Sequence, residues 1–126
     1  MRVVLDTSVL IAADVSEIQG EIAISAASVA ELHFGVLVTK DDAIRAERLR
    51  RLSVLQRTFD PLPIDERVAA SYGKLAAELA RSGRRPRSRV MDLLIAATAH
   101  AHDARLVTRD PKDLEGIGHL IDIIAV

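Results

Sequence analysis

The sequence reads RVMDLLIAATA at positions 89–99, a mostly apolar stretch with a single acid, Asp92, near its start. This pattern predicts a helix that is buried on nearly every face. An ionised carboxylate in such a helix is costly unless it is paired with a cation, hydrogen-bonded or bound to a metal. Alternatively, Asp92 lies in the first turn of a helix capped by Ser88, where the helix dipole favours an acid. Both interpretations stay open on this stretch alone.

Short apolar runs on both sides of this helix predict β-strands, and longer amphipathic or charged runs between them predict further helices. Strands that alternate with helices favour an α/β/α sandwich of three layers with a mostly parallel central sheet of about five short strands. The prolines at 61 and 63 restrict one of these strands to an edge of the sheet. We expect strands at 3–5, 22–24, 61–64, 105–108 and 121–124, and helices at 9–13, 29–38, 41–59, 68–81 and 89–101.

The chain of 126 residues is predicted to form a single domain, residues 1–126. It contains no cysteine, which excludes disulfides and thiolate metal sites. The four histidines show no zinc-ligand spacing. Any metal would therefore be held by oxygen ligands, which favours a hard cation such as Mg²⁺ or Mn²⁺.

Hydropathy and charge also bear on location and partners. No apolar run reaches the ~18 residues that a membrane-spanning helix needs, and a strand follows Met1 directly, so we expect a cytoplasmic protein without a signal peptide. The 17 Lys and Arg residues nearly balance the 18 Asp and Glu residues. Net charge therefore argues neither for nor against a nucleic-acid partner.

Four acids occupy related places in this predicted fold. Asp6 and Asp110 each follow a short apolar strand, whereas Glu31 and Asp92 fall in early turns of helices. Each has an alternative structural role, because Asp6 and Asp110 could be helix N-caps and Glu31 stands three residues after Ser28, as in a capping box. In a parallel sheet, however, strand ends and helix starts meet at one rim, where ligands bind.

Four carboxylates at one rim repel one another and raise one another's pKa unless a cation neutralises them. Clusters of oxygen ligands of this kind hold one or two Mg²⁺ or Mn²⁺ ions. Such ions can activate water and stabilise the leaving oxygen of a phosphodiester. The predicted reaction class is metal-assisted phosphodiester hydrolysis.

The segments around these acids resemble, in order, the motifs of the PIN domain family, and among its members the VapC-type toxins of bacterial toxin–antitoxin pairs. The resemblance rests on VLDTSVLI (4–11), SVAEL (28–32) with Gly35, DLLIAATA (92–99) and LVTRD (106–110). Two departures stand out, a short stretch between the first two motifs and Leu114 where the family usually has phenylalanine.

This resemblance implies a Mg²⁺-dependent endoribonuclease, with Mn²⁺ as a possible substitute, that cleaves structured RNA (tRNA or rRNA) and so inhibits translation. It implies that the catalytic and metal-binding acids are Asp6, Glu31, Asp92 and Asp110. Hydroxyl positions beside the metal correspond to Thr7 or Ser8 and to Thr108, and a further acid corresponds to Asp113.

The resemblance also implies a homodimer and a cognate VapB-like antitoxin whose arm enters an apolar groove and blocks the acidic pocket. Apolar residues beyond the needs of one small core are a modest sequence signal for such a groove. They are Val9, Leu10, Leu32, Val36 and Leu37.

Arginines cluster in two places, before the 89–101 helix and along the 41–59 helix. We expect Arg87 and Arg89 to contact substrate phosphate or to orient the acids, because an acidic cleft needs nearby cations to hold an RNA backbone. The alternative is a solvated basic loop. For Arg45 to Arg51 a solvated helix face is the favoured interpretation.

Two other functions compete with hydrolysis. A phosphotransferase with an aspartyl nucleophile of the haloacid-dehalogenase type needs a second acid two residues after Asp6, where Ser8 stands. A catalytically silent PIN-like module that binds RNA or a protein partner is the non-enzymatic alternative. The presence of all four acids argues against it.

Overall fold

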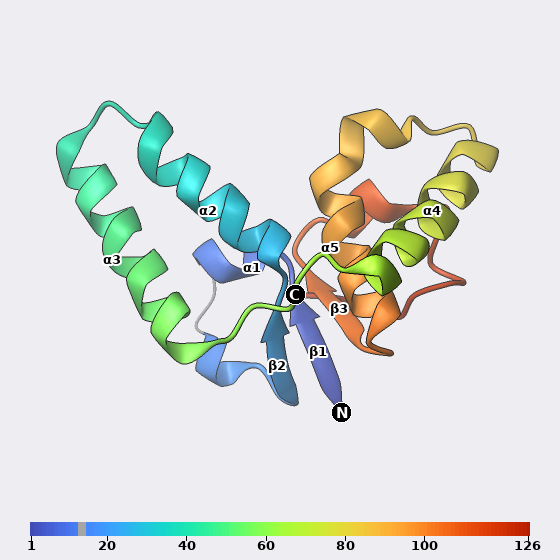
Figure 1. Cartoon of the computed structure of the whole chain (residues 1–126), viewed down its shortest axis with the longest axis horizontal. Helices are drawn as coiled ribbons and strands as arrows, with labels where there is room; N and C mark the ends of the chain where they lie inside the picture. The colour runs from blue at the N-terminus through green and yellow to red at the C-terminus, as the bar shows by residue number, and fades with distance from the viewer. Residues whose placement is uncertain (13–14) are drawn as a thin grey trace.

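The protein, seen in a computed structural model, is described over residues 1–12 and 15–126, and a parallel sheet lies at its centre (Figure 1). The strands are β1 (Arg2–Leu5), β2 (Glu21–Ile24), β3 (Arg105–Thr108) and β4 (Ile123–Ala125), in the order β2-β1-β3-β4. Leu5 is in register with Ile24 on β2 and with Val107 on β3. The strands therefore end together at one edge of the sheet.

Both faces of this sheet are covered, which explains why its strands are apolar at successive positions. Val4 and Leu106 belong to a core cluster that also contains residues of the helices on one face, such as Leu75 and Leu93. Val3, Leu5 and Val107 belong to a second cluster on the opposite face. The predicted α/β/α sandwich with a parallel sheet is confirmed.

The helices form two groups on either side of the strand ends (Figure 1). A hairpin of α2 (Ala26–Val38) and α3 (Asp42–Thr58) lies on one side, and α4 (Glu66–Arg81) and α5 (Val90–Ala101) lie on the other. The remaining helical elements are α1 (Thr7–Ala12) and the short 3-10 helices η1 (Val15–Glu17), η2 (Pro86–Arg89) and η3 (Pro111–Leu114). Over the described residues, none of the helices combines the length and apolar character that crossing a membrane requires.

Asp41 and Asp65 cap α3 and α4 as predicted, accepting hydrogen bonds from the backbone N–H groups of Ile44 and Val68. The prediction that Ser88 caps the Asp92 helix is wrong. Ser88 Oγ instead donates to Arg85 O, because Pro86 begins a 3-10 turn that leads directly into α5. Asp92 does lie in the first turn of α5.

The expected count of about five strands is also wrong, since the described residues form four. Residues 61–64 make only an isolated bridge, in which Leu62 N–H donates to Ile24 O and Leu62 O accepts from Ala26 N–H. Pro61 and Pro63 have no N–H to extend the ladder. The last strand begins at Ile123 rather than at Ile121, whose side chain is buried in the core.

The first helix begins at Thr7, two residues before the predicted start, and its predicted end at Ala13 lies outside the described residues. A buried polar contact joins two of the other helices. Thr98 Oγ1 on α5 lies 2.9 Å from Oγ of Ser25, whose side chain also caps α2. This contact fixes the start of α2 against the C-terminal half of α5, and each of these helices carries one of the predicted site acids.

Candidate acidic site

A cavity of about 240 Å³ opens beside the carboxyl ends of β1 and β3. It gathers residues that are far apart in the sequence, from both strand ends and from α1, α2, α5 and η3. Its acidic lining consists of Asp6, Glu31, Asp92, Asp110 and Asp113, and its other lining residues are Thr7, Ser8, Ile11 and Leu114. The structure therefore brings all four expected acids, and the fifth acid Asp113, to one place.

Asp6 follows the last residue of β1 and is held from two directions. Its Oδ1 accepts hydrogen bonds from the Ser8 backbone N–H at 2.7 Å and from Ser8 Oγ at 2.5 Å. Its Oδ2 accepts a hydrogen bond from Thr108 Oγ1 at 2.5 Å. Asp6 therefore caps α1 and also faces the cavity, so that its structural and candidate functional roles coexist.

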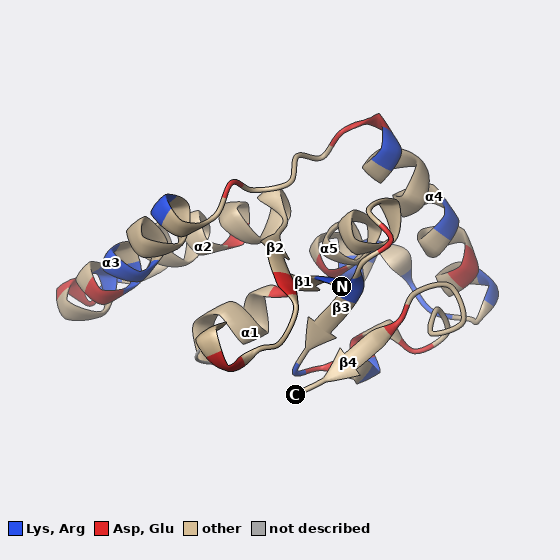
Figure 2. Ribbon diagram, turned by 90° about the horizontal axis from the view of Figure 1, so that it is seen from below, with Lys and Arg blue, Asp and Glu red and all other residues tan. Residues whose placement is uncertain are grey.

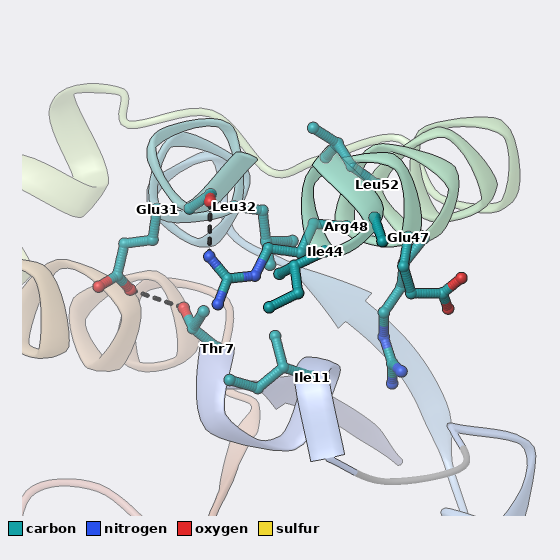
Figure 3. A pocket seen from close by; sticks show the side chains of 11 residues that line it. Thr7, Ile11, Glu31, Leu32, Ile44, Glu47, Arg48 and Leu52 are labelled. Atoms are coloured by element: carbon teal, nitrogen blue, oxygen red, sulfur yellow. Dashed lines mark hydrogen bonds between the residues drawn. The ribbon is translucent and has the colours of Figure 1, made fainter. Parts of the chain in front are cut away.

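Glu31 reaches the cavity from α2 and is held by Thr7. Thr7 Oγ1 donates to Glu31 Oε1 at 2.6 Å and lies 3.2 Å from Ser28 Oγ (Figure 3). The alternative capping-box role of Glu31 is excluded, because α2 begins at Ala26 and is capped by Ser25. Its carboxylate points towards Thr7 of α1 (Figure 3).

Thr108 links two of the acids. Besides donating to Asp6, its Oγ1 accepts a hydrogen bond from the Asp110 backbone N–H at 3.0 Å. Asp110 itself is exposed, and its side chain makes no capping hydrogen bond to the described residues of η3. The alternative role of Asp110 as a side-chain cap is therefore not seen.

The surroundings of Asp92 shift its pKa. Partial burial raises its pKa, and the negative charges of Asp113, Glu31 and Asp6 raise it further. The positive charge of Arg89 acts in the opposite direction. The neighbouring carboxylates thus make it harder for Asp92 to lose its proton.

The two arginines expected at the site differ in their surroundings. Arg89 Nη2 lies 3.2 Å from Asp113 Oδ1, so that Arg89 pairs with a residue of the cavity wall. Arg87 is exposed, does not line the cavity and has no ion pair within the described part of the chain. Neither residue lies in the cavity lining itself.

Figure 2 shows basic segments along α3, where Arg48 and Arg50 are exposed, as expected for a solvated helix face. Arg48 donates to Gly35 O of α2 at 2.7 Å, and Arg51 donates to Leu10 O of α1 at 2.8 Å. Arg45 and Arg50 form ion pairs within α3 itself. Arg48 and Arg51 therefore also tie α3 to α2 and α1.

The donor set suits a hard divalent cation, because every charged ligand in the cavity is a carboxylate. Within residues 1–12 and 15–126, however, no three acidic or imidazole side chains are arranged as a ready metal cage. Asp6 and Glu31 instead point their oxygens at hydroxyl groups. The residues fit a metal by their chemistry and position.

Ile11 and Leu114 complete the cavity wall, and neither was identified as a site residue from the sequence. Ile11 lies one helical turn beyond Thr7 and is 56% exposed. Its spacing of three and four residues from Ser8 and Thr7 is the sequence signal that could have identified it. Leu114 is buried, and its place in η3 directly follows Asp113.

A larger hollow of about 690 Å³ lies between α1, α2 and α3 (Figure 3). Leu32, Ile44 and Leu52 form part of its apolar lining. It shares three residues with the acidic cavity: Thr7, Ile11 and Glu31. We call this hollow the helical groove, and an occupant of it would reach the edge of the acidic cavity.

The residues that suggested surplus apolar surface fall into two groups. Val9, Leu10 and Val36 are buried in the protein itself, so the prediction is wrong for them. Leu32 is half-buried in the helical groove, and Leu37 is 76% exposed near the end of α2. Of the five residues named, Leu32 and Leu37, both on α2, are the two that offer apolar surface.

Comparison with known proteins agrees with this arrangement. The family model described as the PIN domain matches residues 3–119. Ribonuclease VapC5 of Mycobacterium tuberculosis is 38% identical over 113 residues, which are 85% of this chain and 82% of that protein. Ribonuclease VapC8 of the same organism is 37% identical over 75% of this chain and 88% of its own.

A solved structure described as a member of the VapBC family of toxin–antitoxin systems, VapBC-5 from Mycobacterium tuberculosis, is similar over the whole fold. The alignment has a TM-score of 0.85 at 38% identity and covers 99% of this chain and 98% of that one. The similarity therefore extends over the sheet and the helices.

Proposed function

This chain belongs to the PIN domain family, and we propose that it is a metal-dependent endoribonuclease, the toxin of a toxin–antitoxin pair. The observation that carries the proposal is the convergence of five carboxylates from separate elements on one cavity. Burial raises the pKa of Asp92 there, and the negative charges of Asp113, Glu31 and Asp6, which raise it further, also attract a cation. Two relatives at 37–38% identity are named ribonucleases, which supports the same activity.

The proposed cofactor is Mg²⁺, with Mn²⁺ as a substitute. When bound, such an ion makes water a better nucleophile and stabilises negative charge on the phosphodiester. The chain supplies the positions of the ligands, because Ser8 and Thr108 fix Asp6 and Thr7 fixes Glu31. Asp92 supplies a half-buried charge, and exposed Asp110 stands at the end of β3.

The proposed substrate is structured RNA, a tRNA or an rRNA, whose cleavage in the cytoplasm would inhibit translation. The carboxylates repel an RNA backbone, so cations near the cavity have to hold it. Exposed Arg87 is suited to this role, and Arg89 borders the cavity through Asp113. Alanine at Arg87 and Arg89 should weaken RNA affinity and its salt dependence, whereas Arg57→Ala, an exposed arginine of α3, should not.

The proposed protein partner is a VapB-like antitoxin, and the proposed assembly includes a homodimer of this chain. The helical groove is the proposed site for an antitoxin arm, because it has an apolar lining and shares Ile11 and Glu31 with the acidic cavity. An arm in the groove would block access to the acids. The similar structure described as VapBC-5 belongs to a toxin–antitoxin family, which supports this assignment.

Cleavage of total cellular RNA by the purified protein tests the proposed activity. The reaction is run with Mg²⁺, with EDTA, and with Asp92→Asn, and the cut ends are sequenced. We expect discrete cuts that disappear with EDTA and fall at least about 100-fold in Asp92→Asn, since Asp92 is a proposed ligand. Asp60→Asn, a change at an exposed acid before α4, serves as the matched control.

The alternative is a catalytically silent module that binds RNA or a partner. It predicts no cuts with either metal and RNA binding that survives Asp92→Asn. That result would overturn the nuclease proposal and leave Asp6 with its structural role as the cap of α1.

A further inference from the structure

The cavity lining contains five carboxylates and, among the described residues, no basic side chain. Arg89 stands just behind this lining, at the end of η2 and directly before α5. Its guanidinium lies 3.2 Å from Asp113, and the two side chains are 42% and 35% exposed. One wall carboxylate is therefore already engaged by a cation that belongs to the chain.

The charge of Arg89 also reaches a second acid. The positive charge of Arg89 lowers the pKa of Asp92, whereas the negative charges of Asp113, Glu31 and Asp6 raise it. Arg89 lies three positions before Asp92 in the chain, so both side chains stand at the start of α5. The guanidinium thus offsets part of the repulsion at the cavity.

A second ion pair joins nearly the same two segments without touching the cavity. Arg84 pairs with Glu115, as Arg89 pairs with Asp113. In each pair the arginine lies between α4 and α5, and the acid lies in η3 or directly after it. Neither Arg84 nor Glu115 lines the acidic cavity. The two pairs therefore share a tethering role and differ in their distance from the acids.

We propose that Arg89 is an internal counter-ion of the metal-free site, and that it competes with the divalent cation for Asp113. This inference rests on the proposed metal-dependent function. The ion pair stabilises the folded chain before metal arrives and lowers the affinity of the carboxylates for the metal. Arg89 is thus a positioning residue that acts through Asp113 and sets the metal concentration at which the site fills.

Binding of MnCl₂ to the metal-stripped full chain, measured by isothermal titration calorimetry, tests this role. Thermal unfolding in EDTA is measured alongside, and the variants are Arg89→Gln, Arg89→Lys and the matched Arg84→Gln. We expect Arg89→Gln to bind Mn²⁺ about two- to fivefold more tightly, the range typical of a partly exposed ion pair. It should also lower Tm in EDTA by about 1–4 °C.

The controls separate charge from tethering. Arg89→Lys keeps the positive charge and should retain the wild-type Kd for Mn²⁺. Arg84→Gln removes an ion pair outside the cavity and should also retain this Kd. An unchanged Kd in Arg89→Gln, or an equal change in Arg84→Gln, overturns the counter-ion role. Weaker Mn²⁺ binding in Arg89→Gln overturns it too, because Arg89 would then assist the metal.

The proposed function fails in a different way. If the folded wild-type chain binds no Mn²⁺, the metal-dependent function is overturned, and the counter-ion role with it. If wild type binds Mn²⁺ and cleaves RNA while Arg89→Gln behaves like wild type, only the counter-ion role is lost.

Discussion

At the scale of single residues, one hydroxyl group holds two acids of the cavity. Thr108 Oγ1 donates to Asp6 Oδ2 at 2.5 Å and accepts from the Asp110 N–H at 3.0 Å. Thr108→Val keeps the side-chain shape and removes both bonds. We expect the RNA cleavage rate to fall about 10- to 100-fold and the free energy of unfolding to fall by about 1–2 kcal/mol.

Two variants make this prediction specific. Thr108→Ser retains the hydroxyl and should keep most of the activity. Thr58→Val makes the same change on the exposed end of α3, where Thr58 Oγ1 donates to Val54 O, and should leave cleavage unchanged. A cleavage rate for Thr108→Val equal to that of wild type would show that this hydroxyl does not position the acids.

Asp92 gives a pH dependence to the stability of the metal-free protein. Its pKa is raised in the folded state by burial and by neighbouring acids, so the folded chain holds this proton more tightly than the unfolded chain. The stabilising contribution is complete below the ordinary value of 3.8 and is lost as pH rises through the raised pKa of the folded state. Ionised Asp92 therefore destabilises the metal-free protein at neutral pH.

Asp92→Asn should consequently raise Tm in EDTA at pH 7 by about 2–5 °C. The gain should shrink as pH falls, because protonated Asp92 resembles asparagine in charge. Thermal unfolding monitored by circular dichroism across this pH range measures the effect, with Asp60→Asn as the exposed control. A lower Tm for Asp92→Asn at pH 7 would contradict the repulsion inferred here.

The acids that line the cavity could be predicted from the order of strands and helices. Their hydrogen bonds and ion pairs could not. Asp6 and Asp110 follow parallel strands, so their meeting at one edge depends only on strand direction. The pairing of Arg89 with Asp113 depends on rotamers and on the 3-10 turn that precedes α5, and residue spacing fixes neither. The hydrogen bond from Thr7 to Glu31 similarly depends on how α2 is rotated.

At the scale of elements, the loop between η3 and β4 packs closely on the end of α4. Gly116 has φ +100°, and a Cβ added to it would lie 2.6 Å from Ser82 Oγ. Gly116→Ala is strained both by its backbone and by this contact. We expect it to lower the free energy of unfolding by about 1–3 kcal/mol, measured by denaturant titration.

Gly118 provides the matched control two residues later. A Cβ added there meets no atom within 4 Å, and its φ lies outside the left-handed region. Gly118→Ala should change the free energy of unfolding by less than about 1 kcal/mol. Equal effects of the two substitutions would contradict the close packing of this loop on α4.

The starts of helices could be predicted from the sequence where a side chain next to the helix caps it. The aspartates at 41 and 65 cap helices in the structure as their sequence context predicts. The strand predicted at 61–64 fails because two prolines leave Leu62 alone to pair with its neighbour. Ser88 fails as a cap because Pro86 starts a separate 3-10 turn, which the sequence pattern of α5 did not reveal.

At the scale of the whole molecule, the acidic cavity lies where two parts of the fold meet. Asp6 and Asp110 come from the ends of adjacent central strands, Glu31 comes from the α2–α3 hairpin, and Asp92 comes from α5. The buried contact between Ser25 and Thr98 holds α2 against α5. A cation held between these acids would therefore bind parts of the chain from both sides of the sheet edge.

The most direct test of this account is anomalous diffraction from crystals of the protein grown with Mn²⁺. We predict an anomalous peak in the acidic cavity, within coordination distance of carboxylate oxygens of Asp6 and Asp92, that is absent from Asp92→Asn crystals. A peak elsewhere would contradict it. So would an empty cavity at saturating Mn²⁺, with the oxygens of Asp6 still engaged by Ser8 and Thr108.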